Sequence, residues 1–235
     1  MRAVRSIAVL AALALLSGAT RMDPENPTCP AEPDFGPASA MRLTPADKHG
    51  KRVLLAEGNI DATLPARLKA AIEADDRIEE IWLRSRGGNA RAGNEAGRII
   101  RSYRGMLTRI PAGWACFSAC NFVFMGGDRR VVEEGGVFMV HMFTHTNDRA
   151  LIDEVVSEGS KATAELIGSI EQSSALLASE DNDFLIRMGI SRKLLTDIMY
   201  KQQAVKSEGN PSTRYCLSQA EVREYNVMPV EKPVR

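Results

Sequence analysis

Short apolar runs and stretches of helical spacing follow one another from about residue 48 onward. Apolar runs predict strands at 52–56, 78–83 and 106–110. Between them, apolar residues recur every three or four positions, which predicts helices over 62–74 and 92–103. Because strands that alternate with helices form parallel sheets with crossover connections, the pattern indicates an α/β fold.

The second half of the chain continues this pattern with less regular spacing. Residues 118–125 are nearly all apolar or small and predict a buried helix. Residues 148–178 predict a long helix with a break near Gly159 or Gly168. The remaining elements are expected as strands at 130–132, 137–140 and 215–217, a helix that begins near Ser191 with Ser191 as N-cap, and a helix capped by Ser218 through a capping box with Glu221.

The first 47 residues lack this periodicity. Residues 1–19 combine two arginines with an unbroken apolar run at 7–16, which is typical of a secretory signal peptide. That run is about half as long as a membrane-spanning helix. Residues 20–47 are rich in Pro, Asp, Glu and Ala, which predicts a linker or flexible arm. We therefore expect an exported protein, periplasmic or secreted, with a single domain at 48–235.

The balance of acidic and basic residues bears on whether the protein binds nucleic acid. Lys and Arg total 30, as do Asp and Glu, so the formal net charge is zero. Neutralising a phosphate backbone requires a cationic excess, so the sequence argues against nucleic-acid binding. No ATPase motif is visible, which leaves no ATPase partner to expect, and no motif indicates a cofactor.

Four cysteines are compatible with either disulfides or metal binding. Cys29, Cys116, Cys120 and Cys216 allow three pairings, among them Cys116–Cys120 with Cys29–Cys216. Cys116 and Cys120, together with His141 and His145, also have the spacing of a structural zinc site. An oxidising compartment favours disulfides over thiolate ligands, so we expect disulfides and no bound metal.

The segment around Ser118 could carry nucleophilic chemistry. A serine needs a nearby base to become a nucleophile, and His141 ends an apolar run 23 positions later. If Ser118 opens the helix, the amide of Ala119 has no intrahelical partner and can bind a developing oxyanion. The alternative is an ordinary N-cap serine beside a half-buried histidine. Gly87 and Gly88 close the strand at 78–83, where they form either a tight turn or a close approach to a ligand.

These motifs resemble those of the Clp protease proteolytic subunit. The order is Ser-x-Gly-Gly, then a serine among small residues that opens an apolar helix, then a glycine, an arginine and a histidine. The Cys-x-Ser-Ala-Cys segment is similar to exported bacterial ClpP/crotonase-like proteins. The resemblance covers residues 52–228 and is firmest over 81–142. It implies a spiral of ββα units in which Ser118 is the nucleophile, His141 the base, and the amides of Gly88 and Ala119 the oxyanion hole.

The chain departs from this family at two positions. The position of the family's triad aspartate falls near Thr213 or Arg214, and neither side chain can orient an imidazole as a carboxylate does. Asn210 is the closest substitute as third member, with Glu208 and Asp197 as further candidates. The second departure is Arg86, which stands where the family has a proline.

Together these observations predict an exported serine hydrolase, in particular a peptidase that acts on a peptide or protein substrate. The incomplete triad leaves an alternative open, in which the fold binds peptides or partners without catalysis. In that case the former active site is cross-linked by a disulfide or holds zinc. The resemblance also implies a homo-oligomer assembled through the helical region at 148–178.

Overall fold

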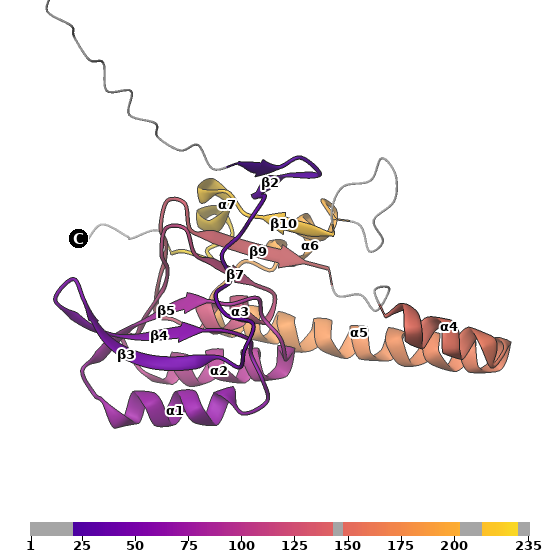
Figure 1. Ribbon diagram of the computed structural model, residues 1–235, viewed down its shortest axis with the longest axis horizontal. Coiled ribbons are helices and arrows are strands. Elements are labelled where there is room, and N and C mark those ends of the chain that lie inside the picture. The colour runs from indigo at the N-terminus through magenta and orange to yellow at the C-terminus, as the bar shows by residue number, and fades with distance from the viewer. Residues whose placement is uncertain (1–20, 143–147, 203–212, 230–235) are drawn as a thin grey trace, which may run out of the picture.

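The computed structural model describes residues 21–142, 148–202 and 213–229, and its largest element is a five-stranded sheet (Figure 1). The strand order is β3 (Arg42–Lys48), β4 (Lys51–Glu57), β5 (Ile78–Arg84), β6 (Leu107–Ile110) and β8 (Arg129–Val132). β3 pairs antiparallel with β4, and the other neighbours pair in parallel. The predicted α/β fold with a parallel sheet is therefore confirmed.

Crossover helices cover one face of this sheet. α1 (Leu64–Ala74) connects β4 to β5, and α2 (Ala90–Ser102) connects β5 to β6. Both lie below the sheet in Figure 1. α1 begins with a proline in its first turn, and the Asn89 side chain caps α2 by accepting from the amide of Ala92 (2.9 Å). Their apolar faces join one main core, whose largest fully buried members include Leu54, Leu68, Ile81, Ile100 and Phe124.

A second, three-stranded sheet packs beside the first. Its order is β10 (Arg214–Cys216), β9 (Val137–His141) and β7 (Ala115–Phe117), with β7 parallel and β10 antiparallel to β9. α3 (Ala119–Met125) follows β7 directly. The sequence did not indicate β7, because three residues are too few to show a period.

The C-terminal helices include a hairpin that projects away from the sheets (Figure 1). α4 (Arg149–Ser157) and α5 (Ser160–Met188) are separated at Gly159, whose φ of 102° ends the first helix, whereas Gly168 lies inside α5. α6 is Lys193–Met199 with Arg192 at its N-cap position, one residue after the expected cap, but it is the hydroxyl of Ser191 that accepts from the amide of Lys193 (3.3 Å). α7 (Gln219–Glu224) has the predicted capping box between Ser218 and Glu221.

Part of the segment expected to be an arm is held against the rest of the chain. β1 (Met22–Asp23) and β2 (Asn26–Pro30) form a two-stranded sheet, and a disulfide joins Cys29 to Cys216 of β10. Farther along, Phe35 and Met41 are buried. The predicted signal peptide at 1–19 lies outside the described residues. Within the described ranges, no helix combines the length and the apolar character needed to cross a membrane.

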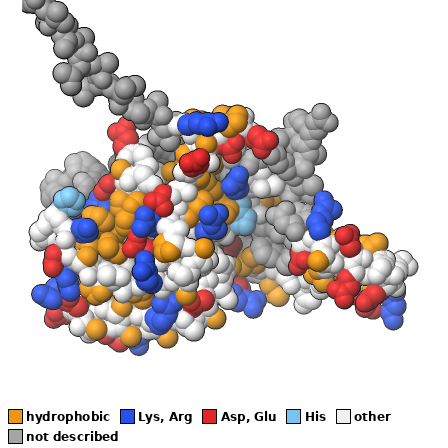
Figure 2. Space-filling model, in the orientation of Figure 1, with side chains coloured by type: hydrophobic (Ala, Val, Ile, Leu, Met, Phe, Trp, Pro, Cys, Tyr) orange, Lys and Arg blue, Asp and Glu red, His pale blue; other side chains and the backbone are white. Residues whose placement is uncertain are grey.

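Charged side chains of both signs are mixed on the face drawn in Figure 2. Lys and Arg are interspersed with Asp and Glu there. Opposite charges in the protein are also joined directly, as in the pair of Arg84 with Asp34 (2.8 Å). This face therefore offers no single basic surface of the kind that tracks a phosphate backbone.

Candidate functional site

Ser118 and His141 are brought together by the pairing of two short strands. β7 and β9 run in parallel, with Phe117 opposite Met139, so both strands end at the same edge of their sheet. Ser118 is the first residue after β7 and His141 is the last residue of β9. Residues at the ends of neighbouring parallel strands lie side by side. This explains why Ser118 and His141 are in contact although 23 positions separate them in the sequence.

The turn into α3 exposes the Ser118 side chain at a strained backbone position. Its φ of 58° and ψ of −124° are rare for a residue with a side chain and cost about 1–3 kcal/mol. Such strain persists only where the surroundings fix it, and it concentrates at functional sites. The Cys116–Cys120 disulfide encloses Ser118 and bridges the turn from β7 to α3.

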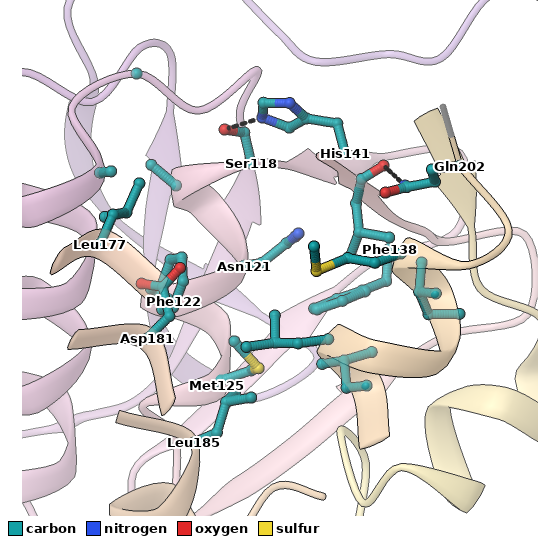
Figure 3. Close-up of a pocket in the computed structure, with 18 residues that line it drawn as sticks. Ser118, Asn121, Phe122, Met125, Phe138, His141, Leu177, Asp181, Leu185 and Gln202 are labelled. Carbon is teal, nitrogen blue, oxygen red and sulfur yellow. Dashed lines mark hydrogen bonds between the residues drawn. The ribbon is translucent and has the colours of Figure 1, made fainter. Parts of the chain in front are cut away.

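The Ser118 and His141 side chains are hydrogen-bonded in the orientation that lets the serine hydroxyl donate its proton to the ring. Ser118 Oγ lies 2.7 Å from His141 Nε2 (Figure 3). His141 Nδ1 lies 2.8 Å from the carbonyl oxygen of Met142. A carbonyl only accepts, so Nδ1 carries the proton and Nε2 is free to accept from the Ser118 hydroxyl. The ring also packs on Phe117, with 4.7 Å between centroids.

Burial keeps this histidine neutral. It lowers the pKa of His141 below its usual value of 6.5, and the bond to Met142 opposes the effect without cancelling it. A neutral imidazole is the form that can take a proton from serine, and the lowered pKa favours this form at neutral pH.

The glycine pair after β5 lies directly against the serine turn. A Cβ on Gly87 would lie 2.5 Å from the Phe117 carbonyl oxygen and 2.8 Å from Ser118 Cβ. The hydroxyl of the fully buried Ser85 accepts from the Gly87 amide (3.0 Å), which fixes the loop. Within the described part of the chain, the amides of Gly88 and Ala119 donate to no other protein group. Both border the same cavity as Ser118.

The zinc alternative does not fit the cysteines as they stand. The sulfur atoms of Cys116 and Cys120 are bonded to each other, and those of Cys29 and Cys216 likewise, so none is a free thiolate. His145 lies outside the described residues. Across residues 21–142, 148–202 and 213–229, no three His, Cys, Asp or Glu side chains gather where they could hold a metal ion. The disulfide pairing is the one that the sequence offered as a possible set.

A cavity of about 280 Å³ opens beside Ser118 and continues between α3, α5 and α6 (Figure 3). Its walls are mostly apolar, with Phe122, Met125, Phe138 and Leu185 among them. The polar exceptions away from the Ser–His pair are Asn121, Asp181 and Gln202. Gln202 donates to the carbonyl of Val140 (3.1 Å), which holds the end of β9 just before His141.

The position of a third triad member is taken by the backbone. Asn210 and Glu208, two of the three predicted candidates, lie outside the described residues. Asp197 lies on α6, where it accepts from Thr196 (3.4 Å), and among the described residues no hydrogen bond joins it to His141. The observed partner of the ring is the Met142 carbonyl, which fixes the tautomer but adds no negative charge.

The sequence analysis did not identify several residues that border the cavity or fix the loop beside Ser118. Ser85 was noted only as part of a glycine motif, and Asn121, Asp181 and Gln202 were not singled out. The helical spacing of Leu177, Asp181 and Leu185 would have placed the aspartate on the same face as two leucines.

Arg86, the second departure from the family, stacks on Phe35 with 4.7 Å from the guanidinium carbon to the ring centroid, so it packs against the N-terminal segment.

The comparisons with known proteins concern the fold. The chain is similar to a ClpP1 variant from Listeria monocytogenes, with 14% identity and a TM-score of 0.45, over 74% of this chain and 86% of that chain. It is also similar to the enoyl-CoA hydratase ECHA3 from Mycobacterium marinum, with 19% identity and a TM-score of 0.33, over 46% of this chain and 56% of that one. An enoyl-CoA hydratase from Shewanella pealeana matches with 12% identity and a TM-score of 0.31, over 41% of this chain and 48% of that one.

The chain is similar to both ClpP and enoyl-CoA hydratase structures. The chain spans about half the length of the two hydratases. No protein-family model matches the sequence, and no curated protein matches it. Likeness at this level assigns no activity, so the reaction is inferred from the residues themselves.

The lowered pKa of His141 leads to a prediction about pH. The rate of serine modification should be constant near neutrality and fall about tenfold per pH unit below the pKa of His141, with a midpoint below 6.5, because the protonated ring cannot accept the serine proton. Labelling by an uncharged fluorophosphonate between about pH 4.5 and 8.5 measures this. A midpoint above 6.5 would contradict the assignment of His141 as base.

Proposed function

We propose that this protein is a serine hydrolase, and in particular a peptidase, with Ser118 as nucleophile and His141 as general base. The observation that carries the proposal is the 2.7 Å contact between Ser118 Oγ and His141 Nε2, with the opposite ring nitrogen held by the Met142 carbonyl. A serine, a neutral imidazole in the correct tautomer and two unused amides are the parts that acyl transfer requires.

In the proposed reaction, Ser118 Oγ attacks the carbonyl carbon of the substrate while its proton passes to His141 Nε2. The negative charge that forms on the carbonyl oxygen is bound by the amides of Gly88 and Ala119. Collapse of this intermediate breaks the bond to the leaving amine, which takes the proton from Nε2. Water then hydrolyses the acyl-serine by the same steps, with His141 again accepting and returning the proton.

The size of the cavity supports a peptide substrate. About 280 Å³ is at the lower end of ligand pockets and suits one amino-acid side chain rather than a large cofactor-linked acyl group. The walls bordering Ser118 would receive the side chain next to the scissile bond. Among the described residues no carboxylate contacts the His141 ring, so the imidazolium that forms during the reaction is stabilised less and we expect a slow enzyme.

The proposal is tested by covalent labelling with a fluorophosphonate probe. We expect mass spectrometry to place a single adduct on Ser118 of the wild-type protein and none on Ser118→Ala. The serine variant must keep the wild-type melting temperature for this comparison. Folded wild-type protein that remains unlabelled would overturn the hydrolase and favour the alternative, a fold that binds peptides without cleaving them.

We further propose that the protein is exported. The signal-like residues 1–19 support this, and so do two disulfides, which form in oxidising compartments. Expression with and without residues 1–19 in a bacterial host tests the proposal, because only the full chain should reach the periplasm with its cysteines oxidised.

A homo-oligomer stays a prediction, with α4 and α5 as the proposed contact. Large apolar side chains are exposed along this hairpin, namely Leu151, Val156, Ile167 and Leu176. Patches of this kind on a projecting element are typical of association surfaces. We expect light scattering to give a multiple of the single-chain mass, and Ile167→Glu with Leu176→Glu to reduce it. A mass of one chain for the wild type would contradict the prediction.

A further inference from the structure

The cavity beside Ser118 is bordered by a carboxyl group that has no partner among the described residues. Asp181 lies on α5, one helical turn from both Leu177 and Leu185, and all three line the cavity (Figure 3). Its neighbours on the helix, Glu180 and Asp183, pair with arginines at the surface. Within the part of the chain that the structure describes, Asp181 makes no hydrogen bond or ion pair.

A second residue of the cavity lining, Asn121, has a side-chain oxygen without a donor among the described residues. Asn121 is only 5% exposed, and its amide nitrogen donates to the Met139 carbonyl (2.7 Å), which fixes the orientation of the side chain. Its Oδ1 is buried and has no hydrogen-bond partner among the described residues. A buried acceptor left unpaired costs free energy that a ligand donor would recover.

The two oxygens lie in an otherwise apolar lining that ends at the reactive pair. Ser118 and His141 lie at one end of the cavity in Figure 3. Phe122, Met125 and Phe138 are among the apolar residues that line the rest of it. The complementary ligand is an apolar stem that carries hydrogen-bond donors, preferably with positive charge. A lysine side chain has this form, and its three donors suit two acceptors better than the five donors of arginine.

We propose that this cavity binds a lysine side chain of the substrate, with Asp181 as the residue that determines specificity and Asn121 as the second acceptor. The inference rests on the proposed peptidase and names its substrate class, namely peptides cleaved next to lysine. Asp181 would pair with the ammonium group, and the apolar walls would contact the four methylenes.

The acid–base state of Asp181 bears on how a cation would bind beside it. Burial, assisted by the nearby charge of Glu180, raises the pKa of Asp181 to about 7. An ammonium group placed beside the carboxyl would favour its charged form and lower that pKa, so binding near neutral pH would release protons.

The test separates binding from chemistry by using the full-length Ser118→Ala protein. Two peptides that differ only in one residue, lysine or the uncharged isostere norleucine, are compared by calorimetry. We expect the lysine peptide to bind at least about tenfold more tightly, and the ratio to fall toward one in Ser118→Ala/Asp181→Asn. Glu180→Gln in the same background is the matched control, since it removes a neighbouring charge that does not line the cavity, and it should preserve the ratio.

Three outcomes would overturn this inference: equal or tighter binding of norleucine, a ratio that Asp181→Asn leaves unchanged, or no binding of either peptide. None of them bears on labelling of Ser118, which tests the hydrolase itself. Conversely, lysine-selective binding by a protein that no fluorophosphonate labels would preserve the cavity assignment and refute the peptidase.

Discussion

His141→Ala is expected to reduce the rate of Ser118 labelling, and of any peptide hydrolysis, by about a thousandfold. The ring is the only group that the structure shows hydrogen-bonded to Ser118 Oγ among the described residues, so no other base is in place to take the proton. The side chain is only partly buried, so its loss should leave the melting temperature close to that of the wild type.

The same variant offers a readout that a purely structural role would not give. Imidazole added to the solution can enter the space left by the ring and should restore part of the labelling rate. His49→Asn is the matched control, because His49 is exposed and stacks on Trp82 (6.0 Å between centroids), on another part of the surface. An unchanged rate in His141→Ala would remove the histidine from the mechanism.

Gly88→Ala is expected to slow labelling by about a hundredfold and to lower the free energy of unfolding by about 2 kcal/mol. Gly88 has a φ of 140°, and an added Cβ would lie 2.2 Å from the carbonyl oxygen of Ile60. The loop must therefore move, and with it the amide that we assign to the oxyanion. Labelling kinetics and chemical denaturation measure the two effects on the same samples.

Gly105→Ala separates conformational strain from the loss of the oxyanion donor. Gly105 also has a positive φ, of 79°, but nothing lies within 4 Å of the added Cβ. This variant should lose about 1 kcal/mol of stability and keep the labelling rate. If Gly88→Ala behaves in the same way, its amide does not bind the reacting oxygen.

The sequence was most informative where periodicity is strong. The strands and helices between residues 52 and 110 follow the expected pattern because each buries one regular apolar face. The pairing of Ser118 with His141 was expected from their chemistry and from the resemblance, and the parallel pairing of β7 with β9 explains how they meet. β7 itself, only three residues long, could not be recognised from its own pattern.

What the sequence could not indicate depends on backbone atoms and helix register. The partner of His141 is a carbonyl oxygen, and every residue carries one, so no residue type marks the position of Met142. Asp181 stands in an acidic stretch of α5, and although its spacing from Leu177 and Leu185 places all three on one helix face, only the packing of α5 shows that this face borders the cavity. The segment before residue 48 has no apolar period, and it is held by the Cys29–Cys216 disulfide, by the short strands β1 and β2, and by the pairing of β3 with β4 at the edge of the main sheet.

The Cys29–Cys216 bond sets a requirement on biosynthesis. Its cysteines are separated by 187 residues, and closing a loop of this length disfavours the unfolded chain by about 5 kcal/mol. During synthesis, however, Cys29 meets Cys116 and Cys120 long before Cys216 exists. A premature bond to either one would displace the turn that carries Ser118. We therefore expect the yield of active protein to rise with the supply of a disulfide isomerase, because early mispaired chains must exchange partners before the last strand can join.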